Sequence, residues 1–202
     1  MSARANGTQG YADEADRLVT SYEELTFEGV QREVLHLIPT APCRTLDIGA
    51  GTGRDAAALA ARGHYVTAME PTAELRAHGQ RLHRSPNIVW GDDSLPELKT
   101  LRAAGARFDL VMATAVWMHL DDGERAAAMR NVAALVAPGG RLLMSLRYGP
   151  VPPGRRMFAV PAEETIAQAA EGGLSLIHRS NREDMKGRDD VTWTVLAFQR
   201  GG

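Results

Sequence analysis

The chain has 202 residues, enough for one well-buried domain and too few for two of ordinary size. Hydrophobic residues make up 44% and charged residues 24%, which is typical of a soluble globular protein and argues against a disordered or fibrous one. The formal net charge of −2 provides no large positive field for a phosphate backbone, so we expect no nucleic-acid partner.

The sequence carries no readable targeting or anchoring signal. No run approaches the ~18 apolar residues of a membrane span. Residues 1–10 have neither an apolar core nor a basic amphipathic pattern, so we predict no signal or transit peptide, no membrane partner and a cytoplasmic location. The single cysteine, Cys43, excludes an internal disulfide framework and a site made of several thiolates, and no metal site is predicted.

The predicted elements begin with a helical cap over residues 1–40, where Phe27, Val30, Val34 and Ile38 follow a helical spacing. From residue 44 onward, short aliphatic runs alternate with helical patterns, which indicates a parallel sheet covered on both faces. The predicted strands are Thr45–Ile48, Tyr65–Met69, Asn87–Trp90, Phe108–Ala113 and Arg141–Leu146. The predicted helices are Asp55–Arg62, Thr72–His83, Leu95–Ala104 and Glu124–Val136.

The pattern changes after the fifth predicted strand. A Pro/Gly loop, Tyr148–Gly154, precedes a helix at Ala162–Glu171 and two strand-like runs, Leu174–His178 and Thr192–Phe198. The charged loop Asn181–Asp190 between these runs is too short for a crossover helix, so we predict an antiparallel hairpin at the sheet edge. The expected fold is therefore α/β: a Rossmann-like, doubly wound, seven-stranded and mostly parallel sheet with helices on both faces.

The first predicted strand ends in an acidic residue and a glycine-rich turn, Asp47-Ile-Gly49-Ala-Gly51-Thr-Gly53. Glycines let the backbone pass close to a ligand. Dinucleotide-binding proteins use G-x-G-x-x-G at this point, but here the third glycine comes one residue early and Arg54 stands where Gly or Ala would be needed. A carboxylate at Asp47 would also repel a pyrophosphate and attract a cationic ligand.

At this point the chain resembles the class I S-adenosylmethionine-dependent methyltransferases, whose motif is D-x-G-x-G-x-G. The resemblance implies that Asp47 lies near the amino-acid part of S-adenosylmethionine and that Glu70, at the end of the second strand, accepts from the two ribose hydroxyls. It also implies that an acid after the third strand, Asp92 or Asp93, approaches the adenine amino group. The stretches Phe108–Thr114 and Leu135–Met144 are similar to the family's fourth-strand motif and its turn into the fifth strand.

The resemblance implies one methyltransferase domain over residues 1–202. Its expected parts are the helical cap (1–40), a cofactor-binding core (44–147) and an acceptor-side loop, helix and hairpin (148–202). The expected cofactor-binding residues are Asp47, Gly49, Ala50, Gly51, Gly53, Glu70, Asp92, Asp93, Thr114, Tyr11 and Tyr22. The two tyrosines belong to the cap, which in similar enzymes folds over the cofactor; packing in the core is the alternative for both.

The acceptor is expected to be a small molecule. The N/D-P-P-Y-like motif of amino-methylating enzymes is absent from Ala113–Trp117, and the pair Pro42-Cys43 precedes the first strand, at the wrong end for a cytosine-C5 enzyme. A base is optional when geometry supplies much of the catalysis. His119 is the candidate base, with orientation of its loop or capping of the next helix as the alternative. The acceptor atom stays open between O, N and C.

Arginines near the Pro/Gly loop raise the hypothesis of an anionic acceptor. Guanidinium groups hold carboxylates and phosphates bidentately, and Arg147, Arg155 and Arg156 flank this loop; we single out Arg147 as an acceptor-binding residue. The alternative is that all three are solvated surface residues. Trp117 and Met118 belong either to the wall of the acceptor pocket or to the core.

Two other functions stay open. A non-catalytic module that binds S-adenosylmethionine would carry the same cofactor motif, because binding and transfer are separable. A nicotinamide-dependent oxidoreductase has a similar fold and turn, and Asp47 and Arg54 argue against it. The sequence leaves the oligomeric state open between monomer and homodimer.

Overall fold

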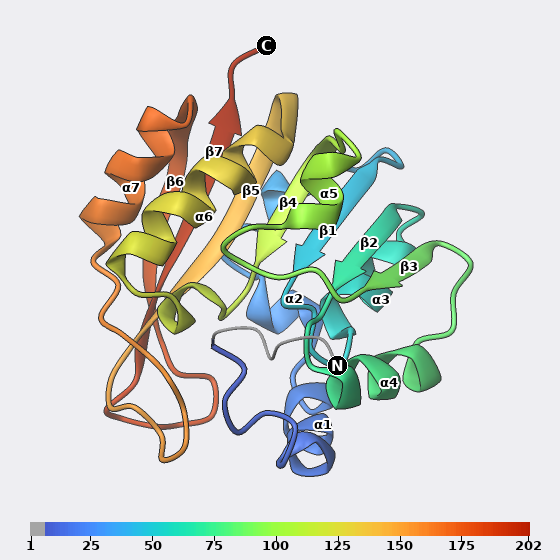
Figure 1. Cartoon of the computed structure of the whole chain (residues 1–202), viewed down its shortest axis with the longest axis vertical. Coiled ribbons are helices and arrows are strands. Elements are labelled where there is room, and N and C mark those ends of the chain that lie inside the picture. The colour runs from blue at the N-terminus through green and yellow to red at the C-terminus, as the bar shows by residue number, and fades with distance from the viewer. Residues whose placement is uncertain (1–6) are drawn as a thin grey trace.

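The computed structural model describes residues 7–202 and contains one seven-stranded sheet with the order β3-β2-β1-β4-β5-β7-β6 (Figure 1). Strands β1 to β5 are parallel, and β7 pairs antiparallel with both β5 and β6. The strand order reverses beside β1, which is the arrangement of doubly wound sheets. The predicted fold and the antiparallel C-terminal hairpin are therefore confirmed.

The elements follow the predicted order. The strands are β1 Arg44–Ile48, β2 Tyr65–Met69, β3 Ile88–Gly91, β4 Phe108–Ala113, β5 Val136–Tyr148, β6 Leu174–Glu183 and β7 Thr192–Arg200. The α-helices are α1 Ala15–Glu23, α2 Phe27–Val30, α3 Arg54–Ala61, α4 Ala73–Leu82, α5 Lys99–Ala103, α6 Asp122–Leu135 and α7 Ala162–Glu171. Two 3₁₀ helices, η1 Leu35–Leu37 and η2 Trp117–His119, complete the set.

Several boundaries differ from the prediction, including the start of β5, which is Val136 rather than Arg141. Helix α5 begins at Lys99 rather than Leu95, because Leu98 adopts a left-handed backbone conformation (φ 45°) that a right-handed helix cannot include. Helix α6 begins two residues early, at Asp122, because Asp121 and Glu124 form a reciprocal capping box. Strand β6 runs to Glu183, five residues beyond the predicted end, with a register shift between Leu176 and His178.

The sheet separates two apolar layers, since alternate residues of a strand point to opposite faces. On one face, Val111 of β4 packs in a cluster that includes Leu101 of α5, Met129 of α6 and Ala169 of α7. On the other face, the cluster around β4 residues Leu110 and Met112 includes residues of the N-terminal segment and of α3, namely Phe27, Val34, Ala56 and Leu59. Figure 1 shows α5, α6 and α7 in front of the sheet and α2 and α3 behind it.

Helix α1 lies apart from these layers, beside α4 and below the ends of the central strands (Figure 1). Its buried residues Ala15 and Leu18 pack with Leu75 of α4 in a small third cluster, against which Tyr11 and Tyr22 also pack. The N-terminal segment thereby covers the carboxyl edge of the parallel strands, the edge at which open α/β sheets bind ligands.

Candidate functional site

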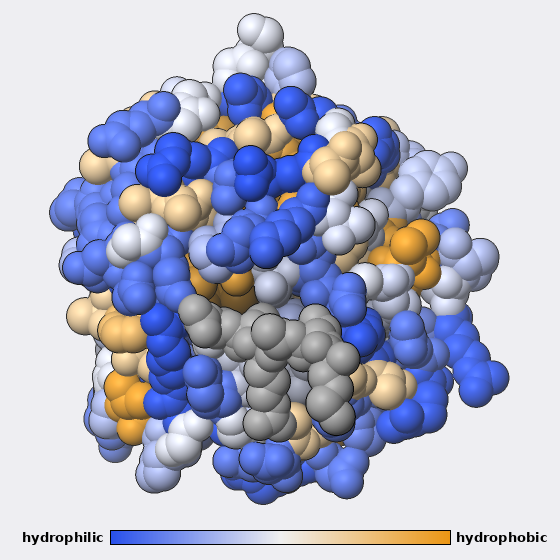
Figure 2. Space-filling model, viewed as in Figure 1, coloured by the Kyte–Doolittle hydropathy of each residue, from blue (hydrophilic) through white to orange (hydrophobic). Residues whose placement is uncertain are grey.

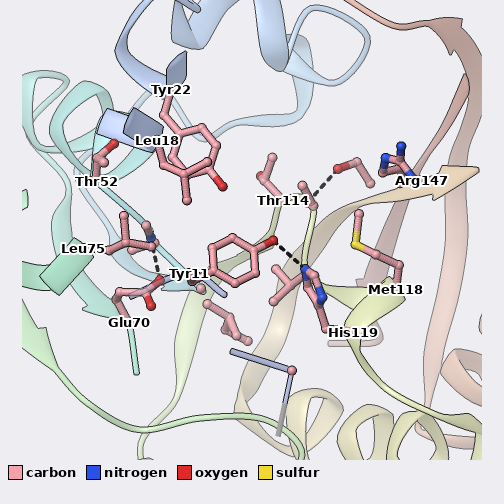
Figure 3. Close-up of a pocket in the computed structure, with 18 of the residues that line it drawn as sticks. Tyr11, Leu18, Tyr22, Thr52, Glu70, Leu75, Thr114, Met118, His119 and Arg147 are labelled. Carbon is pink, nitrogen blue, oxygen red and sulfur yellow. Dashed lines mark hydrogen bonds between the residues drawn. The ribbon is translucent and has the colours of Figure 1, made fainter. Parts of the chain in front are cut away.

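A cavity of about 550 Å³ opens at this carboxyl edge, a size that suits a small ligand. Its walls come from the turn after β1, the ends of β2, β4 and β5, the N-terminal segment, and the hairpin between β6 and β7. Figure 2 shows the face of the molecule on which apolar surface lies in a hollow bordered by hydrophilic residues. Figure 3 shows Glu70 and Leu75 on one side of the cavity, Arg147 and Met118 on the other, and Tyr11 between them.

The glycine turn forms part of the cavity wall through Gly49, Ala50 and Gly51. Gly49 has a left-handed backbone (φ 67°), and a Cβ atom there would lie 2.9 Å from Cγ1 of Val116, so a larger residue would be both strained and crowded. Gly53 is not part of the wall. It begins α3 with φ 88°, and a Cβ there would lie 2.6 Å from the Trp90 ring, so this glycine permits close packing of α3 on β3.

Asp47 is the last residue but one of β1, lies in the cavity wall and is only 2% exposed. Its Oδ2 atom is buried and accepts no hydrogen bond from any residue that the structure describes. Burial raises the pKa of Asp47 well above its usual value, and the nearby Asp55 raises it further. A buried acceptor without a partner is costly, so this oxygen fits a ligand that brings a cationic donor.

Glu70 follows β2 and is held in one orientation by the backbone. Its Oε2 accepts from the amide of Gly51 at 2.8 Å, and its Oε1 accepts from the amide of Thr72 at 2.7 Å. Burial raises the pKa of Glu70, while these backbone donors lower it. Each carboxylate oxygen retains a second acceptor site, so the pair fits a ligand with two adjacent hydroxyl groups.

Thr114 lies in the cavity wall at the end of β4, within a buried network that sequence reasoning missed. Gln31 donates from Nε2 to Asp55 Oδ2 at 2.8 Å and to Thr114 Oγ1 at 3.0 Å, and Thr114 in turn donates to Asp55 at 3.2 Å. Arg54 completes the network through an ion pair with Asp55 at 2.7 Å. Asp55 looks like an ordinary helix-start acid in the sequence, and nothing in the local pattern connects it to Gln31.

His119 of η2 is buried and meets Tyr11 at the centre of the cavity (Figure 3). Its Nδ1 lies 2.9 Å from the carbonyl oxygen of Arg156, so Nδ1 carries the proton and Nε2 is left as an acceptor. The Tyr11 hydroxyl donates to this Nε2 at 2.9 Å. Burial lowers the pKa of His119, and Arg155, Arg156 and Arg147 lower it further, which keeps the imidazole neutral.

The remaining predicted cofactor residues lie in different places. Tyr11 and Tyr22 both line the cavity and pack against the α1–α4 cluster, and burial raises the pKa of both phenols. Asp93 reaches the cavity, but its carboxylate accepts from the amides of Ser94 at 3.1 Å and Leu101 at 3.0 Å, which organises the turn before α5. Asp92 is not among the residues that line the cavity.

The three singled-out arginines have different partners. Arg156 is paired with Asp121 at 3.0 Å and Glu124 at 2.7 Å and lies outside the cavity wall. Arg155 lines the cavity, where it pairs with Glu14 and stacks over the Tyr11 ring at 4.3 Å.

Arg147 is 8% exposed and also lines the cavity, so it is not a solvated surface residue. It donates only to the carbonyl oxygens of Gly149 and Pro150, and it has no carboxylate partner among the described residues. The two apolar residues predicted for the acceptor pocket or the core, Trp117 and Met118, lie in different places. Met118 faces the cavity, whereas Trp117 is fully buried in the core.

The cavity has two chemically different sides. Acidic residues gather near the glycine turn, namely Asp47, Asp55, Glu70 and Asp93. Basic residues gather on the side of β5 and the β6–β7 hairpin, namely Arg147, Arg155, Arg182, Lys186 and Arg188, together with Asp184. Among residues 7–202, no group of three or more His, Cys, Asp or Glu side chains is placed to hold a metal ion.

Residues 45–140 match a family model described as a methyltransferase domain. This match supports a methyltransferase family for this part of the chain. The predicted resemblance to S-adenosylmethionine-dependent methyltransferases is thereby confirmed over residues 45–140. No helix in residues 7–202 is long and apolar enough to cross a membrane.

Two relatives share part of this methyltransferase domain. An uncharacterised methyltransferase of Mycobacterium tuberculosis is 32% identical over 119 residues, which cover 56% of this chain and 58% of that protein. A ubiquinone biosynthesis O-methyltransferase of Xylella fastidiosa is 34% identical over 109 residues, covering 54% of this chain and 43% of the relative. The chain thus matches only about half the length of these relatives.

Solved structures share the whole fold at low sequence identity. One is a 1,6-didemethyltoxoflavin-N1-methyltransferase of Burkholderia thailandensis with bound S-adenosylhomocysteine, at a TM-score of 0.67, 21% identity, and coverage of 93% of this chain and 87% of that one. Another is a magnesium protoporphyrin IX methyltransferase of Synechocystis with bound S-adenosylmethionine, at a TM-score of 0.67, 16% identity, and coverage of 98% and 87%.

Proposed function

We propose that this protein transfers a methyl group from S-adenosylmethionine to a small-molecule acceptor. The observation that carries the proposal is the unpartnered buried oxygen of Asp47 beside the glycine turn of a methyltransferase domain. An ammonium group would supply the donor that this oxygen lacks. The oriented carboxylate of Glu70 would accept from two ribose hydroxyls.

The cofactor, when bound, supplies a methyl carbon activated by a sulfonium for in-line displacement. The chain's own contribution is alignment, which is worth about 7–11 kcal/mol where geometry is good. Gly49, Ala50 and Gly51 give close backbone approach on the acidic side, and Tyr22 covers it from the cap. Residues 44–147 would form the cofactor core, and 148–202 would complete the acceptor side.

His119 is proposed to receive the proton when the acceptor loses one. Its Nε2 is unprotonated and accepts from the Tyr11 hydroxyl, so a proton from an acceptor hydroxyl or amine would pass to Tyr11 as the phenol proton moves to Nε2. Arg147 is proposed to bind an acidic group of the acceptor, because this buried guanidinium has no carboxylate partner among the described residues.

Isothermal titration of the full chain with S-adenosylmethionine, S-adenosylhomocysteine and NADH, at matched concentrations, tests the cofactor. We expect micromolar affinity for both sulfur nucleosides and no heat with NADH. Binding of NADH alone would replace the proposal with an oxidoreductase. Binding of both nucleosides, with no methyl transfer in a screen of acidic acceptors, would favour the non-catalytic module.

A further inference from the structure

A row of three side chains crosses the C-terminal strands at the acceptor side of the cavity. Arg147 of β5 is in register with Trp193 of β7, and Trp193 is in register with Arg182 of β6. Side chains at paired positions of neighbouring strands stand on the same face of a sheet. All three residues line the cavity, so the row presents a guanidinium, an indole and a second guanidinium to one ligand.

Arg182, like Arg147, has no acidic partner among residues 7–202. Its Nη1 contacts only the sulfur of Met185, a weak acceptor, at 3.0 Å. Its Nε is buried, and the N–H there finds no acceptor among the described residues. The guanidinium lies 5.6 Å from the centre of the Trp193 ring, which holds it against the row.

None of the described acids pairs with Arg147 or Arg182, although Asp184 and Asp190 lie near enough to raise the pKa of Arg147. Asp184 accepts two hydrogen bonds from Arg188, at 2.9 and 2.7 Å, and one from Trp193 Nε1 at 3.0 Å, and these donors hold its pKa far below the usual range against the effect of burial. Glu33 lies near enough to raise the pKa of Arg182, yet its Oε1 accepts from Arg32 and its Oε2 has no partner. The cavity therefore offers two guanidinium groups that a ligand could neutralise.

We propose that the acceptor carries two separated acidic groups, carboxylate or phosphate, one bound by Arg147 and the other by Arg182. The two Cα positions are two strand spacings apart, about 10 Å, so the apolar part that joins the groups would lie along Trp193. This inference rests on the proposed function, since it identifies the acceptor class of the same site. A buried or half-buried cation is costly without an opposite charge, and a ligand with two anionic groups supplies a charge for the buried Arg147 and for the half-buried Arg182.

The test uses the full chain, with and without saturating S-adenosylhomocysteine, titrated with benzene-1,4-dicarboxylate, benzoate and 4-carboxyphenyl phosphate. We expect each probe with two anionic groups, called a dianion here whatever its total charge, to bind at least tenfold more tightly than benzoate, because a second charge-assisted contact is added. Preference between the two dianions distinguishes carboxylate from phosphate. Equal affinities for benzoate and both dianions would overturn the proposal without any variant.

Variants locate the effect. Arg182→Gln should lower the affinity for the dianions about tenfold and leave benzoate unchanged, whereas Arg147→Gln should weaken all three probes. Arg179→Gln is the matched control, because Arg179 lies on the same strand but is exposed and paired with Glu163 of α7. Unchanged dianion affinity in Arg182→Gln would show that Arg182 does not bind the ligand and only balances the charge of Glu33. That result would overturn the proposal. Failure of the nucleoside to bind would contradict the proposed function alone, since the titrations without it still test the row.

Discussion

At the scale of single residues, Asp47 combines a place in the cavity wall with an unfavourable environment. Its carboxylate is buried near Asp55 and retains one oxygen without a donor. Such a group is expected to cost stability in the ligand-free protein and to contribute affinity when a cation arrives. The two effects are separable by one isosteric change.

Replacing Asp47 by Asn should weaken binding of S-adenosylhomocysteine at least tenfold, because the amide cannot make the charge-assisted contact. Titration calorimetry measures the change, and the exposed Asp189→Asn is the control. Wild-type affinity in Asp47→Asn would show that the ammonium group binds elsewhere.

The same residue should give the ligand-free protein a pH-dependent stability. Because the pKa of Asp47 is raised in the folded state, the folded protein binds a proton more readily than the unfolded chain. The stability that this proton contributes is full below the unfolded pKa near 3.8 and is lost as pH rises through the folded pKa. Glu70 acts in the same direction. Urea unfolding between pH 4 and 8 should therefore show a smaller loss of stability with rising pH in Asp47→Asn than in the wild type. A parallel pair of curves would contradict the burial argument.

The hydrogen bond between Tyr11 and His119 predicts a change in the pKa of His119 that can be measured without a methyl acceptor. The phenol donates to Nε2 and so stabilises the neutral imidazole. Tyr11→Phe removes this donor and should raise the pKa of His119 toward its usual value, as measured by nitrogen NMR of the imidazole ring. Tyr148→Phe serves as the control. An unchanged pKa would mean that burial, the largest cause, and the neighbouring arginines keep His119 neutral without the Tyr11 donor.

At the scale of elements, the strands were the most predictable part. The runs Tyr65–Met69 and Phe108–Ala113 match β2 and β4 at both ends, because apolar runs bounded by turn residues depend on local sequence. The glycine turn and Glu70 were also predictable, since their spacing follows the strand ends. Gln31, Arg182 and Trp193 were not, because their places depend on the path of the cap and on the register of β5, β7 and β6.

Helix α6 offers a test of an element that supports the site. Asp121 caps the helix by accepting from the Glu124 amide at 2.9 Å, and it also pairs with Arg156, whose carbonyl holds His119. Asp121→Ala should lower the free energy of unfolding by about 1 kcal/mol. Urea denaturation measures this loss, and the exposed Asp13→Ala should show almost none.

At the scale of the whole molecule, the N-terminal segment connects the two sides of the cavity. It contacts the side of the glycine turn through Glu23 with Thr52 and Asp16 with His78. It contacts the side of the basic residues through Glu14 with Arg155 and Ser21 with Lys186. These contacts are mostly polar and partly exposed, so each is weak. The segment is held chiefly by the small apolar cluster between α1 and α4.

Ligand binding should therefore slow the opening of this segment more than that of the sheet. Hydrogen exchange over residues 8–26 is expected to slow when S-adenosylhomocysteine is added, because residues such as Tyr22 line the cavity from above. Strand β4 provides the internal control. Equal protection changes in both regions would indicate a global effect of ligand on stability.

The register shift in β6 also bears on whether this edge strand can pair with another chain. An outermost strand of ten residues exposes a line of backbone donors and acceptors that another chain could extend into a larger sheet. The irregularity between Leu176 and His178 falls beside the exposed Leu176 and Ile177, where such growth would be most favourable. The irregular backbone interrupts that template, so the most apolar part of the edge is the part least able to seed aggregation.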